Sequence, residues 1–237
     1  MKNDKINLVA FDADDTLWAH ESIFHEAQLK FKSSLEKYSS KEITMEKLNE
    51  YERKNLQYFG YGVKGFMLSM IETAIELTQG KIPAKEIQQI IDLGRWMLNH
   101  PVQVLDNVEF TLKQLRKAGY TLIIITKGDL FDQETKIARS GLAGLFDAIE
   151  IVSEKKADTY QSIFGKHQFQ ASETVMVGNS IKSDILPVLE IGGGHAIHIP
   201  FHITWVLEQV QDHQLEGHDY HKLSDISLVP ALLEGMG

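Results

Sequence analysis

The chain has 237 residues, of which 43% are hydrophobic, so it can bury one substantial core and still carry a second, smaller unit. Its 24 basic and 33 acidic residues give a formal net charge of -9, which disfavours nucleic acid and anionic membranes as partners. The absence of cysteine excludes disulfides, thiolate nucleophiles and cysteine-based zinc sites.

The N-terminal sequence has only a short apolar run before an acidic cluster, which does not resemble a signal peptide. No stretch approaches the roughly 18 uninterrupted apolar residues that a membrane helix needs. We therefore expect a soluble, cytoplasmic protein. We also expect it to be a monomer or a homodimer.

Short apolar runs rich in β-branched residues predict strands of a parallel sheet that is covered on both faces. In chain order they span residues 6–11, 120–126, 148–152 and 174–178, with a weaker fifth run at 196–199. Helical periodicity lies between them, for example before the turn at Gly119 and over residues 185–189. This alternation predicts a doubly wound α/β core.

The pattern changes between Leu17 and His100, where no run predicts a strand. Three amphipathic stretches occur there instead, over residues 24–35, 66–77 and 87–97. We expect a helical insert at residues 18–99 that divides the α/β core into residues 1–17 and 100–237.

The strongest chemical signal is an acidic cluster, Asp12, Asp14 and Asp15, directly after the first predicted strand. Open α/β sheets bind ligands beyond the carboxyl ends of their strands. Carboxylates this close repel one another unless a cation or bound protons compensate. A solvated acidic turn is the plain alternative. A calcium-binding loop is disfavoured because Leu17 occupies the position that would need glycine.

Three further polar segments each follow a separate predicted strand, and together they would converge on one crevice. They are Thr126-Lys127-Gly128, Glu154-Lys155-Lys156 and the segment from Gly178 to Asp184. Hydroxyl, ammonium and backbone N–H groups at such positions suit a phosphate. Taken singly, the segments are also compatible with a turn, a solvated lysine pair and an ordinary helix cap.

With these four segments in this order, the chain resembles the haloacid dehalogenase superfamily over its whole length. The resemblance implies a Rossmannoid parallel sheet with helices on both faces and an inserted all-α cap domain. It also implies that Asp12 is the nucleophile, that Asp14 is the general acid and base, and that Thr126 and Lys156 hold a phosphoryl group. Lys156 is favoured over Lys155 because the family's lysine usually precedes a proline, whose place Ala157 takes here.

The same resemblance implies a magnesium ion held by Asp12, the backbone carbonyl of Asp14 and the segment from Asn179 to Asp184. Asn179 stands where the family has an acid, so the metal loses one anionic ligand unless Asp184 coordinates it directly. An amide oxygen still suits a hard cation, which predicts weaker metal binding and not lost activity.

The implied activity is magnesium-dependent hydrolysis of a small phosphorylated metabolite through an aspartyl-phosphate intermediate. A 2-haloacid dehalogenase with the same nucleophile and a non-catalytic phosphate-binding protein are the alternatives. Dehalogenases of this superfamily lack the second aspartate, so Asp14 favours phosphoryl transfer. Lys127 could also contact the phosphate. Lys64, Tyr61 and Phe66 lie in a glycine-rich turn of the insert and could contact the part of the substrate that leaves. A mobile hinge or a plain connection between helices is the alternative for this turn.

Overall fold

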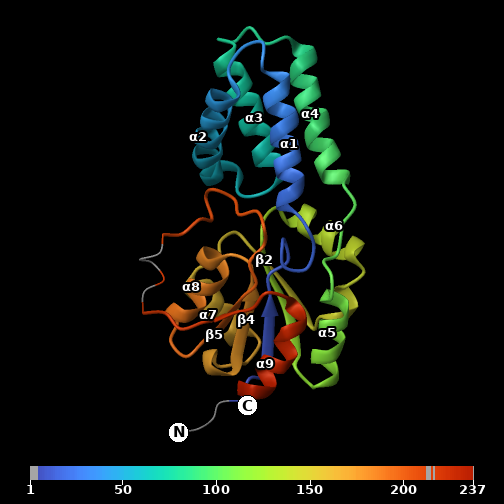
Figure 1. The fold of residues 1–237 in the computed structure, drawn as a ribbon, viewed down its shortest axis with the longest axis vertical. Coiled ribbons are helices and arrows are strands. Elements are labelled where there is room, and N and C mark those ends of the chain that lie inside the picture. The colour runs from blue at the N-terminus through green and yellow to red at the C-terminus, as the bar shows by residue number, and fades with distance from the viewer. Residues whose placement is uncertain (1–4, 212–214, 216, 237) are drawn as a thin grey trace. The chain divides into compact units, whose positions relative to one another are not determined.

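The computed structural model describes residues 5–211, 215 and 217–236, and Figure 1 shows its ribbon. The chain divides into two compact units, and we call them the core unit and the helical unit. The core unit contains Met1–Ala19, Val102–Lys127 and Gln133–Gly237, and the helical unit contains His20–Pro101 and Gly128–Asp132. The sequence did not predict that the short segment 128–132 groups with the helices.

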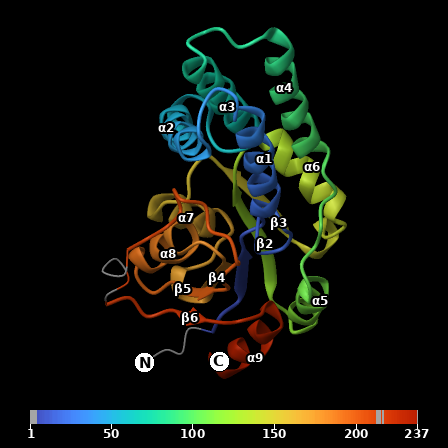
Figure 2. The ribbon, with the colours of Figure 1, turned by 45° about the horizontal axis from the view of Figure 1, so that its top comes forward.

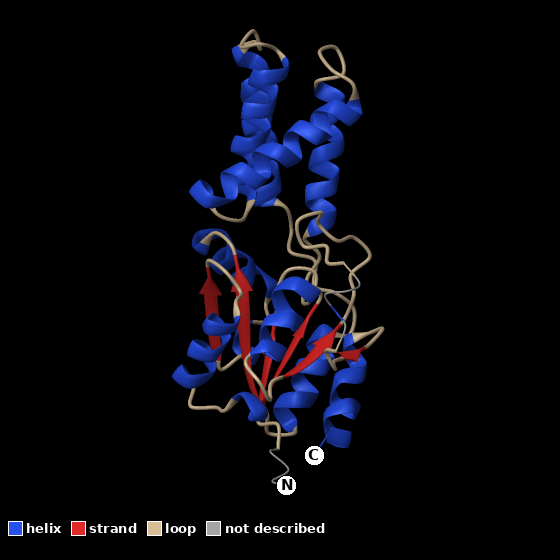
Figure 3. Cartoon of the chain, turned by 90° about the vertical axis from the view of Figure 1, so that its left-hand side faces the viewer, coloured by secondary structure: helices blue, strands red, loops and turns tan. Residues whose placement is uncertain are grey.

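A six-stranded sheet forms the centre of the core unit, in the order β3-β2-β1-β4-β5-β6. Neighbouring strands pair in parallel, and Figure 3 shows them pointing the same way. The predicted parallel α/β fold is therefore confirmed. The strands are β1 (Leu8–Phe11), β2 (Thr121–Lys127), β3 (Ala148–Val152), β4 (Thr174–Gly178), β5 (His195–His198) and β6 (His221–Lys222).

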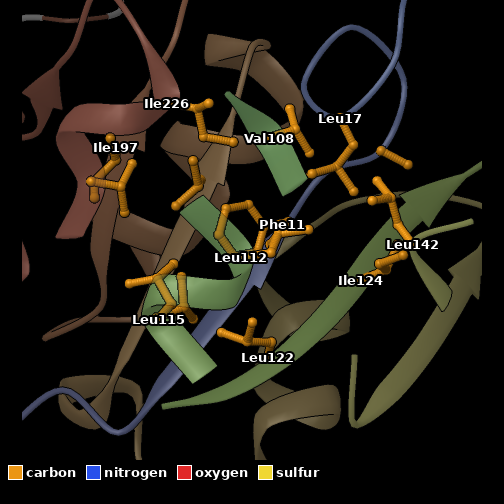
Figure 4. Close-up of a cluster of buried hydrophobic side chains, with 14 of the residues drawn as sticks. Phe11, Leu17, Val108, Leu112, Leu115, Leu122, Ile124, Leu142, Ile197 and Ile226 are labelled. Atoms are coloured by element: carbon orange, nitrogen blue, oxygen red, sulfur yellow. The ribbon is translucent and has the colours of Figure 1, made fainter. Parts of the chain in front are cut away.

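Helices cover both faces of this sheet, which explains why the central strands β1 and β4 are buried along their whole length. On β1, Val9 and Phe11 face one cluster of buried side chains, while Leu8 and Ala10 face the other. The first cluster, part of which Figure 4 shows, receives apolar residues from α5 (Val108–Lys117), α6 (Leu130–Ser140) and α9 (Val229–Met236). The second receives them from α7 (Ala157–Lys166) and α8 (Leu186–Glu190).

Two elements at the end of the chain, β6 and α9, had no clear sequence signal. The edge strand β6 has only two residues, both exposed, which is too short for an alternating pattern. Figure 2 shows β6 leading into α9, and α9 contacts α5.

The helical unit consists of α1 (Glu21–Ser34), α2 (Lys41–Phe59), α3 (Val63–Leu77) and α4 (Ala84–Asn99), together with residues 128–132. Its core contains Phe66, whose ring lies 5.0 Å from that of Phe24. Phe66 is therefore a packing residue, which corrects its predicted substrate contact. Over the described part of the chain, no helix is both long and apolar enough to span a bilayer.

Helix α2 escaped sequence detection because much of its buried face is polar. Its buried residues are Thr44, Leu48, Glu52 and Asn55. Asn55 donates to Ser69 Oγ at 3.1 Å and to Glu72 Oε2 at 2.5 Å, so part of the contact with α3 is a hydrogen-bond network. Glu52 is 7% exposed, and its Oε2 atom has no hydrogen-bond partner among the described residues. Desolvation by burial raises the pKa of Glu52 to about 7, against a small lowering by Arg53.

We predict that Glu52→Gln reduces the loss of stability with rising pH. A carboxyl whose folded pKa is raised contributes its full stability below its ordinary pKa of 4.5 and loses it as the pH rises through about 7. With about 1.4 kcal/mol per pKa unit, the loss is about 3 kcal/mol at most. Urea denaturation of the wild type and of Glu52→Gln at pH 5 and pH 8 measures this change in the free energy of unfolding. The exposed Glu46→Gln should behave like wild type, and equal pH dependence in wild type and Glu52→Gln would contradict the prediction.

Candidate active site

Asp12 and Asp14 lie in a tight turn that directly follows β1. The Asp12 N–H donates to the Val177 carbonyl at 2.9 Å, which continues the pairing of β1 with β4. The chain then bends at Asp15, whose φ of 62° lies in the left-handed region that aspartate tolerates better than most residues. Leu17 N donates to the Ala13 carbonyl at 2.8 Å and closes the turn.

Lys155 lies between two buried carboxylates. Its Nζ is 2.5 Å from Asp12 Oδ1 and 2.7 Å from Asp184 Oδ1, and its side chain is 1% exposed. Lys155 follows β3, Asp12 follows β1, and Asp184 lies in the π-helical turn Ile181–Ile185 after β4. Three strand ends thus meet at one charged centre, at the edge of the sheet where the sequence predicted a site.

The structure places Lys155, and not the favoured Lys156, against Asp12. Lys156 is exposed and stands at the N-cap position of α7, whereas Lys155 is buried against Asp12. The backbone turns into the helix at Lys156, so the preceding side chain is the one that enters the sheet edge. The family's preference for a proline after its lysine had pointed to Lys156, one residue further along the chain.

Burial and neighbouring charges shift the pKa of both Asp12 and Lys155. Desolvation raises the pKa of Asp12 to about 7, and the negative charge of Asp184 adds to this, while Lys155 opposes it. Burial would lower the pKa of Lys155, but the two carboxylates together raise it above its ordinary value. Burial thus works against the negative charge of Asp12, while the two carboxylates favour the positive charge of Lys155.

Asn179 lies beside Asp12. The Thr16 hydroxyl is 3.2 Å from Asp12 Oδ2 and 3.4 Å from Asn179 Oδ1, so one hydroxyl reaches both oxygen atoms. His198 Nε2 lies 3.0 Å from the Asn179 carbonyl, to which the neutral ring can donate. Asn179 is thus held from its side chain and from its backbone.

Glycine at position 178 allows Asp184 to reach Lys155. A Cβ atom on Gly178 would lie 2.3 to 2.5 Å from three atoms of the Asp184 side chain, far closer than packing permits. The other Asp184 oxygen, Oδ2, accepts from Ser180 N at 2.9 Å. The glycine after β4 is therefore a steric requirement of the site.

Asp14 is surrounded by hydrogen-bond donors that the sequence analysis missed. Lys136 Nζ is 2.8 Å from each carboxylate oxygen, Trp18 Nε1 donates to Oδ1 at 2.7 Å, and Gln133 Nε2 donates to Oδ2 at 2.9 Å. Gln133 and Lys136 lie one turn apart on α6. Only this spacing of three residues could have pointed to a shared helix face.

The two predicted phosphate ligands on β2 differ in their surroundings. Thr126 is 1% exposed, one residue before the end of the strand. Lys127 Nζ donates to Ser183 Oγ at 2.8 Å and to Glu208 Oε1 at 2.5 Å. The structure thus gives Lys127 an internal carboxylate partner, so its predicted substrate contact would require it to leave or share Glu208.

Glu208 is a second residue that the sequence did not reveal. Besides Lys127, its carboxylate accepts from Ser180 Oγ at 2.5 Å and from Ser183 Oγ at 2.6 Å. Burial would raise the pKa of Glu208, but Lys127 and the two serines lower it. Glu208 therefore ties the end of β2 to the turn that follows β4.

Lys64 belongs to the helical unit. Its Nζ is 2.9 Å from both Asp129 carboxylate oxygens, and its side chain is 52% exposed. Burial would raise the pKa of Asp129, but the contacts of Lys64 lower it. The predicted contact of Lys64 with a substrate stays a prediction.

Comparisons with known proteins agree on the family of the chain. The family model described as haloacid dehalogenase-like hydrolase matches residues 6–192. A haloacid dehalogenase-like family hydrolase from Xanthomonas campestris is 41% identical, with a TM-score of 0.86, over 100% of this chain and 94% of the other. A search of the curated proteins gave no significant match.

Two more distant structures share the fold. One is a predicted phosphoglycolate phosphatase from Haemophilus somnus, with 16% identity, a TM-score of 0.61, and coverage of 98% of this chain and 99% of that one. The other is a 2-haloacid dehalogenase from Pseudomonas syringae, with 23% identity, a TM-score of 0.63, and coverage of 98% and 100%. Similarity of fold therefore leaves the choice between phosphatase and dehalogenase to the site itself.

We predict that Gly178→Ala destabilises the core unit by about 1–3 kcal/mol, because the new methyl group must displace Asp184. Gly165→Ala in α7 is the matched control, since a Cβ there meets no atom within 4 Å and alanine favours a helix by up to about 1 kcal/mol. Urea denaturation measures both changes. Wild-type stability in Gly178→Ala would contradict the close packing described above.

Proposed function

Because the chain belongs to the haloacid dehalogenase-like hydrolase family, we propose that it is a magnesium-dependent phosphatase that hydrolyses the phosphate monoester of a small metabolite. The observation that carries this choice is Asp14, a second aspartate in the same turn as Asp12, with its carboxylate oriented by three side chains. A halide leaves as a stable anion, whereas an alkoxide leaves far more readily when a general acid protonates it. Protonation of the leaving group by Asp14 therefore serves the second reaction, whereas release of a halide does not require it.

In the first half of the proposed reaction, a carboxylate oxygen of Asp12 attacks the phosphorus atom. A bond forms between Asp12 and phosphorus, and the bond from phosphorus to the ester oxygen breaks. Asp14 gives its proton to the departing oxygen. Lys155 holds Asp12 in place through the 2.5 Å contact, and the Thr126 hydroxyl at the end of β2 is a donor for the phosphoryl oxygens.

In the second half, water attacks the phosphorus atom of the aspartyl phosphate. Asp14, now ionised, takes a proton from that water, and the bond between Asp12 and phosphorus breaks to release phosphate. Asp12 and Asp14 thereby return to their initial protonation states. One residue serves as acid and as base because the two steps need the proton to move in opposite directions.

The oxygen atoms near Asp12 fit a magnesium ion. Asp12 Oδ2 and Asn179 Oδ1 share the Thr16 hydroxyl, so two oxygen donors that suit a hard cation lie close together. Both Asp184 oxygens already accept hydrogen bonds, from Lys155 and from Ser180 N, which makes Asn179 the better candidate for a direct ligand. With Asp12, Asn179 and the Asp14 carbonyl as its ligands, the ion would supply positive charge to the phosphoryl oxygens.

The direct test is release of phosphate from p-nitrophenyl phosphate with and without magnesium. We expect turnover that depends on magnesium in the wild type and none in Asp12→Asn, because the amide cannot form the acyl phosphate. Release of halide from 2-chloropropionate without added metal would instead establish a dehalogenase. Binding of phosphate without either activity would establish a non-catalytic binding protein, and either result would overturn the proposal.

The adjacent lysines after β3 provide a second, internally controlled prediction. Lys155→Met should lower kcat by about 100-fold or more, because Asp12 and Asp184 lose their shared cation. Lys156→Met should stay within about 2-fold of the wild type, because the Lys156 side chain is exposed. The measurement is steady-state hydrolysis, with thermal unfolding of each variant to verify folding. A larger effect at Lys156 than at Lys155 would contradict the assignment.

A further inference from the structure

Three side chains hold the Asp14 carboxylate, and together they make at least four hydrogen bonds to its two oxygens. The Asp14 side chain is 19% exposed and that of Lys136 is 12% exposed. Lys136 contacts both oxygens at 2.8 Å, while Trp18 and Gln133 each hold one oxygen, at 2.7 and 2.9 Å. Neither oxygen of Asp14 is therefore free to rotate without breaking contacts.

The contacts from α6 reach Asp14 from a distant part of the sequence. Trp18 is four residues from Asp14, but Gln133 is 119 and Lys136 is 122 residues away. Gln133 Nε2 also donates to the Lys127 carbonyl at 2.9 Å, which fixes this face of α6 to the end of β2. The orientation of Asp14 thus depends on where α6 lies against the sheet.

We propose that Lys136 and Gln133 are positioning residues for Asp14, and that they set the direction in which Asp14 exchanges a proton with the leaving group and with water. This proposal rests on the phosphatase function proposed above. Trp18 and Gln133 each hold one oxygen and Lys136 contacts both, so the three side chains together define the plane of the carboxyl group. In the proposed reaction, Lys136 and Gln133 influence catalysis through Asp14, so their effect should depend on whether the leaving group needs a proton, whereas an effect of general damage to the fold would not.

The test uses two substrates that differ in their need for a proton. The p-nitrophenolate ion leaves without protonation, whereas the phenolate ion is a stronger base and benefits from a general acid. The parameter kcat/KM reports the step in which Asp12 attacks, and kcat also includes hydrolysis of the aspartyl phosphate. Both are measured with p-nitrophenyl phosphate and with phenyl phosphate for the wild type and the variants.

For Lys136→Met we expect kcat/KM to stay within about 3-fold of the wild type with p-nitrophenyl phosphate and to fall about 10-fold or more with phenyl phosphate. With p-nitrophenyl phosphate, kcat should fall, because Asp14 must still activate water. Lys136→Arg should recover most of the loss, since a guanidinium can also contact both carboxylate oxygens. Lys113→Met, which removes an exposed ion pair on α5, should match the wild type.

A double-mutant cycle gives the second readout. Because Lys136 acts through Asp14, Lys136→Met should change the activity of Asp14→Asn by less than about 2-fold. Gln133→Leu provides an independent variant with the same expected substrate dependence, should Lys136→Met fold poorly. Equal losses with both substrates, or no loss in any variant, would overturn the positioning role while leaving the phosphatase function intact. Absence of phosphate release by the wild type would overturn both proposals.

Discussion

The ammonium group of Lys155 between two buried carboxylates is the interaction on which the site depends. Asp12 and Asp184 come from different strand ends, and both carboxylates are placed within 3 Å of the same nitrogen atom. Without that cation, two negative charges would face each other in a region from which water is excluded, and breaking a buried pair costs about 3–5 kcal/mol. The parallel register of β1, β2, β3 and β4 brings these groups together, so the sheet and the site stabilise each other.

The surrounding charges extend the same arrangement. Asp14 forms an ion pair with Lys136, and Glu208 forms one with Lys127. With Asp12 and Asp184 sharing Lys155, four acidic side chains face three lysines, so each of these lysines already contacts a carboxyl group before any substrate arrives. A phosphate dianion would meet repulsion from this set, and a divalent cation near Asp12 is the simplest compensation. The raised pKa of Asp12 has the same cause, because burial and Asp184 together outweigh Lys155.

The sequence predicted those elements whose pattern is contained in a few consecutive residues. The four main strands and the acidic turn after β1 lie where their apolar runs and carboxylates indicated, because each is defined within about seven residues. Helix α2 was missed since Glu52 and Asn55 occupy its buried face, which erases the amphipathic pattern. Contacts over long sequence separations, such as Lys136 with Asp14 and Glu208 with Lys127, depend on the topology of the whole sheet and leave no pattern in one sequence. The sequence could not tell which of Lys155 and Lys156 contacts Asp12, because that depends on the exact residue at which α7 begins.

The environment of Asp14 also bears on the choice between the two chemistries of the fold. Asp12 and Lys155 would serve a dehalogenase as well as a phosphatase, because both reactions begin with attack by a carboxylate. The second aspartate differs, because a halide leaves without a proton, whereas the oxygen of a phosphate ester leaves far more readily when a general acid protonates it. Here Trp18, Gln133 and Lys136 surround that aspartate and fix its orientation. Orientation matters for a group that must deliver a proton to one atom, because proton transfer requires hydrogen-bond geometry in the transition state. An oriented general acid at Asp14 is therefore the feature of this site that serves loss of an ester oxygen and that loss of a halide does not need.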